Sequence, residues 1–264
     1  MNIAKPSRKL HYIFIILTVL TIVGIVLGLL FFTPKAATPS ATTAVSTIKT
    51  TGQTKQEPEK PVVPSFDKKR LSTTDPSSLW VVVNKSHKIT PAEYTPGDLS
   101  YTTNGVLVSG QILPDLNALI AAAGAKGVTL PIISGYRSYA NQTTLYNNYV
   151  AQYGQAVTDT ISARPGHSEH QLGLAVDLGT PSNPGCSLKA CFATTAEGVW
   201  LATHAQEYGF IVRYTAENTD ITGYDPEGWH IRYIGRELAA EMKSQNITSL
   251  ETFFDISGGK VYAN

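Results

Sequence analysis

The sequence is short of cysteine and of charge, and each shortage excludes a class of protein. Two cysteines among 264 residues exclude a disulfide-dense miniprotein and a zinc finger with four cysteine ligands. Only 16% of the residues are charged, and 21 Lys and Arg residues against 20 Asp and Glu residues leave a net charge of +1. Proteins that bind nucleic acid usually carry a basic excess, so no nucleic-acid partner is expected. The 42% of hydrophobic residues are too many for a wholly disordered chain.

An uncharged run lies near the N-terminus. Residues 12–32 contain no Asp, Glu, Lys or Arg, and an apolar run of this length spans a bilayer as a helix. Basic residues in the preceding segment, 1–11, place that segment in the cytoplasm and the rest of the chain outside (Lys5, Arg8 and Lys9). A cleaved signal peptide is the alternative, although its apolar region is usually about 7–15 residues long. We therefore expect a single-pass transmembrane anchor, and export of the remainder in either case.

The exported part divides into a linker and a domain. Residues 33–74 are rich in Thr, Ser, Pro, Lys and Ala and show no hydrophobic periodicity, which predicts a disordered linker. Residues 75–264 contain all three tryptophans and both cysteines, and we expect them to form one domain.

The domain is expected to mix helices and short strands. Four segments rich in β-branched or aromatic residues predict strands (80–83, 128–134, 210–214 and 229–235). Four segments with helical spacing or helix-ending glycines predict helices (113–127, 139–153, 198–208 and 236–244). Because strands and helices do not alternate strictly, the pattern indicates an α+β fold.

Two clusters carry residues suited to metal chemistry. His170 and Asp177 lie at the ends of a small-residue and apolar stretch that is typical of a loop entering a buried strand. His230 follows Glu227 by three residues in the second cluster. Two histidines and one carboxylate are a ligand set of catalytic zinc, and a nearby glutamate suits a general base. Spacing alone leaves open that the first pair is a loop hydrogen bond or a core histidine with its partner.

Four ordered blocks resemble a known family. These blocks are SGYRSYANQ (134–142), SEHQLGLAVDL (168–178), YGFIVRY (208–214) and EGWHIRYIG (227–235). They are similar to the signature blocks of the VanY-type zinc D-alanyl-D-alanine carboxypeptidases, which belong to a wider group with the D-Ala-D-Ala dipeptidases and the Hedgehog-like fold. The resemblance runs from about Leu79 to Phe254. It implies a small mixed or antiparallel sheet with flanking helices around one Zn²⁺ site.

The resemblance also implies roles for individual residues. His170, Asp177 and His230 would be the zinc ligands, and Glu227 would be the general base. Arg137 would steady the carbonyl oxygen or the terminal carboxylate of the substrate. The remaining expected substrate-binding residues are Ser168 and Gln142. The family often has proline at the position before the tryptophan of the last block, where this chain has Gly228.

The two cysteines lie close together. Cys186 and Cys191 enclose four residues in a loop rich in Pro, Asn and Ser. In an exported domain we expect them to form a local disulfide. A thiol nucleophile is the alternative, but no histidine partner is signalled nearby.

Together with the predicted anchor, the resemblance implies a zinc carboxypeptidase in the bacterial cell membrane that removes the C-terminal D-alanine from peptidoglycan stem peptides or their lipid-linked precursor. An L,D-carboxypeptidase, a D,D-dipeptidase or a stem-peptide endopeptidase would use the same fold. A zinc-stabilised binding module without catalysis is disfavoured, because such a module needs no base beside the metal. The sequence does not indicate an oligomeric state.

Overall fold

The structure is a computed structural model, and it describes residues 66–263. The expected cytoplasmic segment 1–11, the expected anchor 12–32 and most of the expected linker 33–74 lie outside the described residues. Within the described part of the chain, no helix combines the length and the apolar character needed to cross a membrane.

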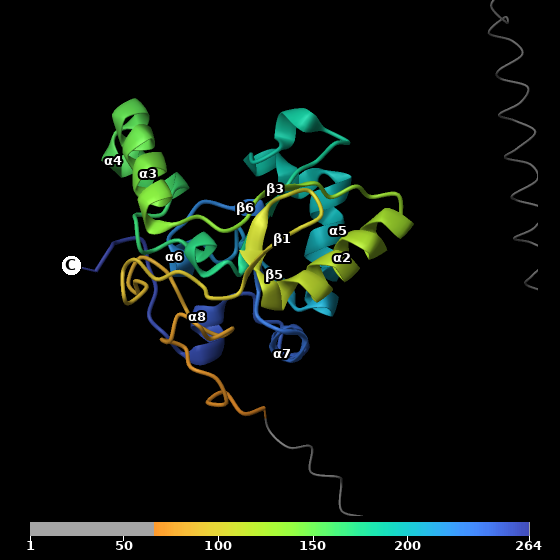
Figure 1. The fold of residues 1–264 in the computed structure, drawn as a ribbon, viewed down its shortest axis with the longest axis horizontal. Coiled ribbons are helices and arrows are strands. Elements are labelled where there is room, and N and C mark those ends of the chain that lie inside the picture. Colours follow the sequence, from red (N-terminus) through yellow and green to blue (C-terminus); the bar gives the residue numbers. More distant parts are fainter. Residues whose placement is uncertain (1–65, 264) are drawn as a thin grey trace, which may run out of the picture. The chain divides into compact units, whose positions relative to one another are not determined.

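Two antiparallel sheets form the β-structure (Figure 1). A hairpin joins β1 (Leu99–Tyr101) to β2 (Leu107–Ser109). The larger sheet has the strand order β3-β4-β6-β5, and every neighbouring pair is antiparallel. Its strands are β3 (Ile132–Ser134), β4 (Ala175–Leu178), β5 (Phe210–Tyr214) and β6 (Glu227–Tyr233).

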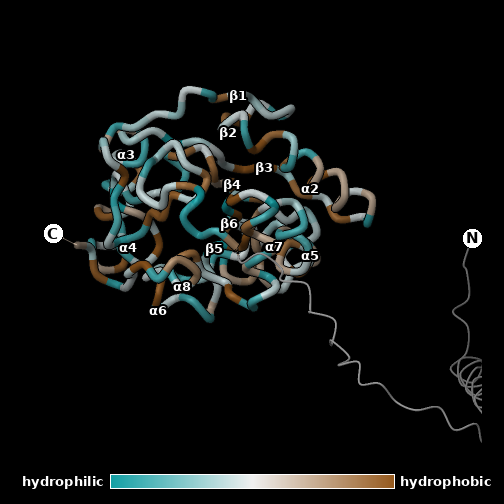
Figure 2. Tube along the Cα trace, turned by 90° about the horizontal axis from the view of Figure 1, so that it is seen from below, coloured by the Kyte–Doolittle hydropathy of each residue, from teal (hydrophilic) through white to brown (hydrophobic). Residues whose placement is uncertain are grey.

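Helices flank the larger sheet on two sides. Figures 1 and 2 show α2 and α5 grouped at one side of its strands, and α3 and α4 at the other. The α-helices are α2 (Leu113–Ala125), α3 (Tyr139–Tyr153), α4 (Gln155–Ile161), α5 (Ala196–His204), α6 (Thr219–Thr222), α7 (Arg236–Ser244) and α8 (Leu250–Phe254). Four 3-10 helices border the site described below or continue α5: η2 (Glu169–Leu172), η3 (Pro184–Cys186), η4 (Ala190–Thr194) and η5 (Ala205–Tyr208). The predicted α+β fold with an antiparallel sheet and flanking helices is confirmed.

The two faces of the sheet differ in polarity because side chains alternate along each strand. On β6, Ile231 and Tyr233 join the apolar core with residues of α2 and α5. The alternate residues, His230 and Arg232, are also buried. Asp177 lies directly opposite His230 on β4. One face of the sheet therefore supports the core, and the other carries buried polar side chains.

The predicted strand at 80–83 is wrong. These residues are buried, as expected, but they form no ladder with another strand. Arginine side chains take the place of a partner strand: Arg232 donates to the carbonyls of Leu79 (3.0 Å) and Val81 (2.9 Å), and Arg213 donates to that of Val83 (3.5 Å). Because side chains from distant strands satisfy these carbonyls, the segment stays irregular.

Packing extends the domain to the N-terminal side of the predicted boundary at Asp75. The ring of Phe66 lies 5.4 Å from that of Trp80 and 5.6 Å from that of Phe253, measured between centroids. Lys68 donates to the carbonyl of Phe253 at 2.6 Å. Residues 66–74 are thus ordered by contact with an aromatic cluster, although their own composition resembles a linker.

Candidate metal centre and active site

Three potential metal ligands meet on the polar face of the sheet. His170 lies in η2, Asp177 in β4 and His230 in β6, and one ligand atom from each lies within 4.8 Å of the others. His170 Nε2 is 3.1 Å from Asp177 Oδ2, and His230 Nδ1 is 3.2 Å from Asp177 Oδ1. All three residues are buried. The pairing of β4 with β6, which spacing along the chain does not show, brings the two clusters together.

The other nitrogen of each histidine has a partner of its own. His170 Nδ1 lies 2.8 Å from the carbonyl of Gly135, and His230 Nε2 lies 3.2 Å from Glu169 Oε2. Both partners are acceptors, so each outer nitrogen can keep its proton while a bound metal takes the inner nitrogen. Second partners of this kind orient metal-binding histidines. The donor set of two imidazoles and one carboxylate fits Zn²⁺ with a coordination position left for water or substrate.

Charges in the cluster shift its titration. Burial alone would raise the pKa of Asp177, but the adjacent His170 and His230 hold it well below its usual range. Burial lowers the pKa of His170. Burial opposes protonation of His230 too, yet its hydrogen bonds with Asp177 and Glu169 raise its pKa to about 9. A metal ion at this place would displace that proton, so its binding would release protons.

A buried ion network stands behind His230. The Glu169 carboxylate accepts from Arg213 Nε at 2.8 Å and from Arg232 Nη1 at 2.9 Å. Arg213 also pairs with Glu251 at 2.6 and 3.0 Å. The side chains of these four residues are at most 1% exposed. Sequence reasoning missed Glu169, although an arginine in each of two otherwise apolar strands signals a buried acidic partner.

Glu227 begins β6 at the edge of this cluster. Its Oε2 lies 3.8 Å from His230 Nδ1, and its side chain is 20% exposed. Burial raises the pKa of Glu227 to about 8, against the opposing effect of His230. A cation at the ligand cluster would favour the ionised carboxylate and oppose this rise.

A cavity of about 480 Å³ opens onto the cluster. Apart from the two cysteines, every predicted site residue lines it. Arg137 lines it and donates to Gln142 Oε1 (3.0 Å) and Ser134 Oγ (2.9 Å). Within residues 66–263, no carboxylate lies within 4.0 Å of the Arg137 guanidinium, so its charge is available to an anionic ligand. Ser168 also lines the cavity, and its hydroxyl has no hydrogen-bond partner among the described residues.

Gln142 is placed to support Arg137. Its amide oxygen accepts from Arg137, and its amide nitrogen donates to the Ala163 carbonyl at 2.7 Å and to Ser162 Oγ at 3.4 Å. The side chain is 1% exposed. Because these groups are engaged inside the protein, Gln142 orients the guanidinium of Arg137, and its direct contact with a substrate stays a prediction.

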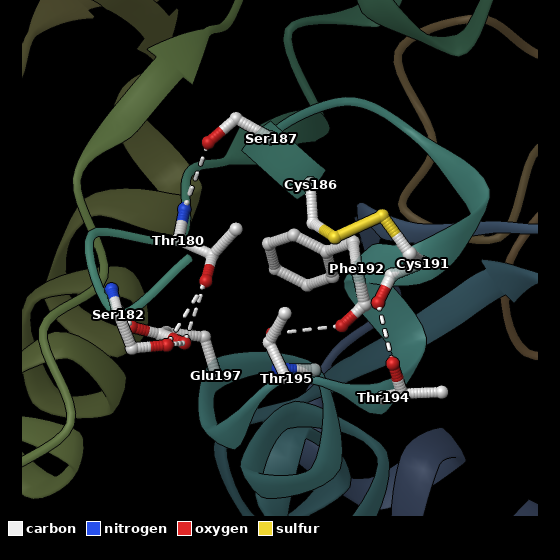
Figure 3. The surroundings of a disulfide bond; sticks show 10 residues. Thr180, Ser182, Cys186, Ser187, Cys191, Phe192, Thr194, Thr195 and Glu197 are labelled. Atoms are coloured by element: carbon white, nitrogen blue, oxygen red, sulfur yellow. Dashed lines mark hydrogen bonds between the residues drawn. A yellow bond between two sulfur atoms is a disulfide. The ribbon is translucent and has the colours of Figure 1, made fainter. Parts of the chain in front are cut away.

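The predicted cysteine pair is drawn in Figure 3, and residues of the loop that it closes line the same cavity. Cys186 and Cys191 are bonded through sulfur atoms 2.05 Å apart. Gly228 lies against the same region, because a Cβ at this position would come within 3.2 Å of Ala193. The close approach of β6 to η4 explains why a glycine stands there.

Comparison with known proteins agrees with this site. A family model described as VanY, D-alanyl-D-alanine carboxypeptidase, matches residues 106–236, which include all the proposed ligands. YodJ of Bacillus subtilis strain 168, which is named as a carboxypeptidase, is 35% identical over 190 residues, covering 69% of this chain and 68% of YodJ. The chain belongs to the VanY family. The family predicted from the four sequence blocks is thus confirmed.

Solved structures of this family share the fold. The structure of the LdcB LD-carboxypeptidase has a TM-score of 0.63 and 34% identity, and the match covers 69% of this chain and 88% of LdcB. A mutant of the vancomycin-resistance D,D-pentapeptidase VanY in complex with Zn(II) has a TM-score of 0.57 and 34% identity. That match covers 67% of this chain and 98% of the mutant. This fold is therefore found in one protein named as an LD-carboxypeptidase and in another named as a D,D-pentapeptidase.

Proposed function

We propose that this chain is a zinc-dependent D,D-carboxypeptidase that removes the C-terminal D-alanine from peptidoglycan stem peptides. One observation carries the proposal: the cluster of His170, Asp177 and His230 shares a cavity with Glu227 and with Arg137, which has no carboxylate partner among residues 66–263. Ligands, a base and a carboxylate-binding group are the parts that a metal-dependent exopeptidase needs. The Zn(II) complex of the VanY neighbour and the peptidoglycan recognition described for LdcB support the metal and the substrate class.

The residues of the chain divide the work of hydrolysis. Zinc bound by His170, Asp177 and His230 would lower the pKa of water and polarise the scissile carbonyl. Glu227 takes the proton from the attacking water and passes it to the leaving amine. Arg137 pairs with the free carboxylate of the terminal residue, which an exopeptidase must recognise. Ser168 offers its hydroxyl to the substrate in the same cavity.

Stem peptides of two lengths test which bond is cut. The full chain with Zn²⁺ is incubated with pentapeptide stems that end in D-Ala-D-Ala and with the corresponding tetrapeptides, and the products are weighed by mass spectrometry. We expect D-alanine to be released from the pentapeptide. Release from the tetrapeptide alone would contradict the proposal and identify an L,D-carboxypeptidase, as in the LdcB neighbour.

Replacement of Glu227 tests catalysis separately from zinc binding. Glu227→Ala removes the base but none of the three ligands, so we expect normal zinc content and a rate about 10²–10⁴-fold lower. Glu217→Ala, an exposed glutamate outside the cavity, is the matched control and should turn over normally. Turnover of Glu227→Ala at the wild-type rate would remove Glu227 from the mechanism.

We also propose that residues 12–32 anchor the enzyme in the bacterial cell membrane, with residues 1–11 in the cytoplasm and the catalytic domain outside. The uncharged run and the basic residues before it support this arrangement. Full-length protein should remain with the membrane fraction, and protease added to intact spheroplasts should remove the catalytic domain. Release of a shortened chain into the medium would instead identify a cleaved signal peptide.

A further inference from the structure

The disulfide closes a short loop that forms part of the catalytic cavity. Three of the four residues between the cysteines line this cavity: Leu188, Lys189 and Ala190. Leu188 has a φ of +54°, in the left-handed region that a leucine rarely adopts. The disulfide thus restrains a backbone conformation that a free loop would disfavour.

Contacts made by residues before and after the disulfide in the chain keep this loop in place. Glu197 accepts hydrogen bonds from Thr180 Oγ1 (2.7 Å) and from the backbone and hydroxyl of Ser182, as Figure 3 shows. Phe192 is fully buried, and its ring lies 6.5 Å from that of Trp229 in β6. Both backbone polar groups of Lys189 make hydrogen bonds. Its N–H donates to the carbonyl of Cys186 (3.1 Å), and its carbonyl accepts from the N–H of Phe192 (2.8 Å). Lys189 is therefore presented to the cavity from a fixed backbone.

The position of Lys189 is opposite to that of Arg137 along the sheet. Because β3 and β4 are antiparallel, Arg137 follows the end of β3 and lies toward the start of β4, where its N–H donates to the carbonyl of His170 at 3.1 Å. The disulfide loop follows the end of β4, toward the end of the sheet where Glu227 begins β6. The two cations therefore line the cavity near opposite ends of β4, the strand that carries Asp177.

We propose that Lys189 binds a carboxylate on the amino-terminal side of the scissile bond and thereby selects acidic peptides. The proposal rests on the proposed function, because it takes Arg137 as the partner of the C-terminal carboxylate. A peptide held there extends past the ligand cluster toward Lys189. Within the described chain, no carboxylate lies within 4.0 Å of the Lys189 ammonium, so its charge is free to pair with a ligand. In a stem peptide, a glutamyl or a diaminopimelyl residue would supply the carboxylate.

Amidated substrates test this selection. Steady-state kinetics are measured on pentapeptide stems with both acidic residues free, with one or the other amidated, and with both amidated. A charge-assisted hydrogen bond at an exposed lysine predicts that Lys189→Gln lowers kcat/KM on the free peptide by about 5- to 10-fold, mostly through KM. It should leave kcat/KM on the fully amidated peptide unchanged. The singly amidated peptide that has lost its dependence on Lys189 identifies the residue bound.

Three further variants separate charge recognition from a structural effect. Lys189→Arg should retain the preference, because it keeps the cation. Lys126→Gln, at an exposed lysine after α2 and outside the cavity, should behave as wild type. The double variant Cys186→Ser, Cys191→Ser should lose the preference while keeping zinc and turnover of the amidated peptide.

Two results would overturn the inference. One is an equal loss on free and amidated peptides for Lys189→Gln, which would indicate a structural role. The other is no loss on either peptide. Failure of the wild-type enzyme to release D-alanine from any of the peptides would instead contradict the proposed function, so the two failures are distinguishable.

Discussion

Replacing Glu169 with glutamine tests whether a residue outside the ligand set controls metal binding. Glu169 is 1% exposed and accepts hydrogen bonds from Arg213, Arg232 and His230. Glutamine keeps the shape but has only one acceptor oxygen. If that oxygen faces the two arginines, the amide NH₂ faces His230 Nε2 and forces that nitrogen to accept. The proton of His230 then moves to Nδ1, the atom that faces Asp177 and the metal position.

Two magnitudes follow from this geometry. Loss of a residue that orients a metal-binding histidine lowers metal affinity by about 10–100-fold. Breaking a buried ion pair by removing one charge destabilises a protein by about 3–5 kcal/mol, which corresponds to a fall in Tm of roughly 6–20 °C for a domain of this size. The variant should therefore be both less stable and weaker in binding zinc.

Glu251→Gln is the matched control, because Glu251 pairs with Arg213 at 2.6 and 3.0 Å but has no hydrogen bond to His230. Zinc affinity is measured by competition with a chelator at a temperature where both variants are folded, and stability is measured by thermal unfolding. We expect both variants to lose stability but only Glu169→Gln to lose affinity. Equal zinc affinity in the two variants would refute the proposed role of Glu169.

Two predictions concern the disulfide loop and the contact of α5 with η4, which follows that loop. Replacing both cysteines with serine should destabilise the domain by about 2 kcal/mol, because the disulfide closes a short loop, and thermal unfolding of oxidised wild type and variant measures the difference. Gly198→Ala should destabilise the domain by about 1–3 kcal/mol, because its Cβ would lie 2.1 Å from the carbonyl oxygen of Phe192. Gly124→Ala in α2 is the control, since a Cβ there meets no atom within 4 Å, and it should stabilise by about 0.5–1 kcal/mol. Stability of Gly198→Ala at or above that of wild type would show that η4 can move away from α5.

Local signals allowed several elements to be predicted closely. The helix predicted at 139–153 is observed at those bounds, because Ser138 caps its first turn by accepting from the N–H of Asn141. The strand predicted at 210–214 and the helix predicted at 236–244 also have the observed bounds. The helix predicted at 198–208 begins earlier, at Ala196, and changes to a 3-10 helix after His204. For the helices, the contacts that fix the bounds are made within a few residues along the chain, whereas the strand also depends on its pairing with β6.

The parts that sequence reasoning could not reach depend on contacts between distant residues. The segment 80–83 has strand-like composition, but whether it pairs depends on arginines about 150 residues away in the chain, so composition could not decide. All three ligands were predicted, but spacing along the chain could not show that the cluster of His170 and Asp177 meets the cluster of His230, because the register of β4 with β6 brings them together. Glu169 was missed for the same reason, because its two arginines come from β5 and β6.

The irregular segment 79–83 ties the beginning of the domain to its metal centre. Its carbonyls accept from the arginines that hold Glu169, and Glu169 in turn holds His230. Opening of this segment would release both guanidiniums, so the segment and the ligand cluster should unfold as one cooperative unit. In native-state hydrogen exchange, the amides of Val82 and His230 should then open with the same free energy. A shortened domain that begins after Val83 would lose these carbonyl groups, and His230 would no longer be held for metal binding.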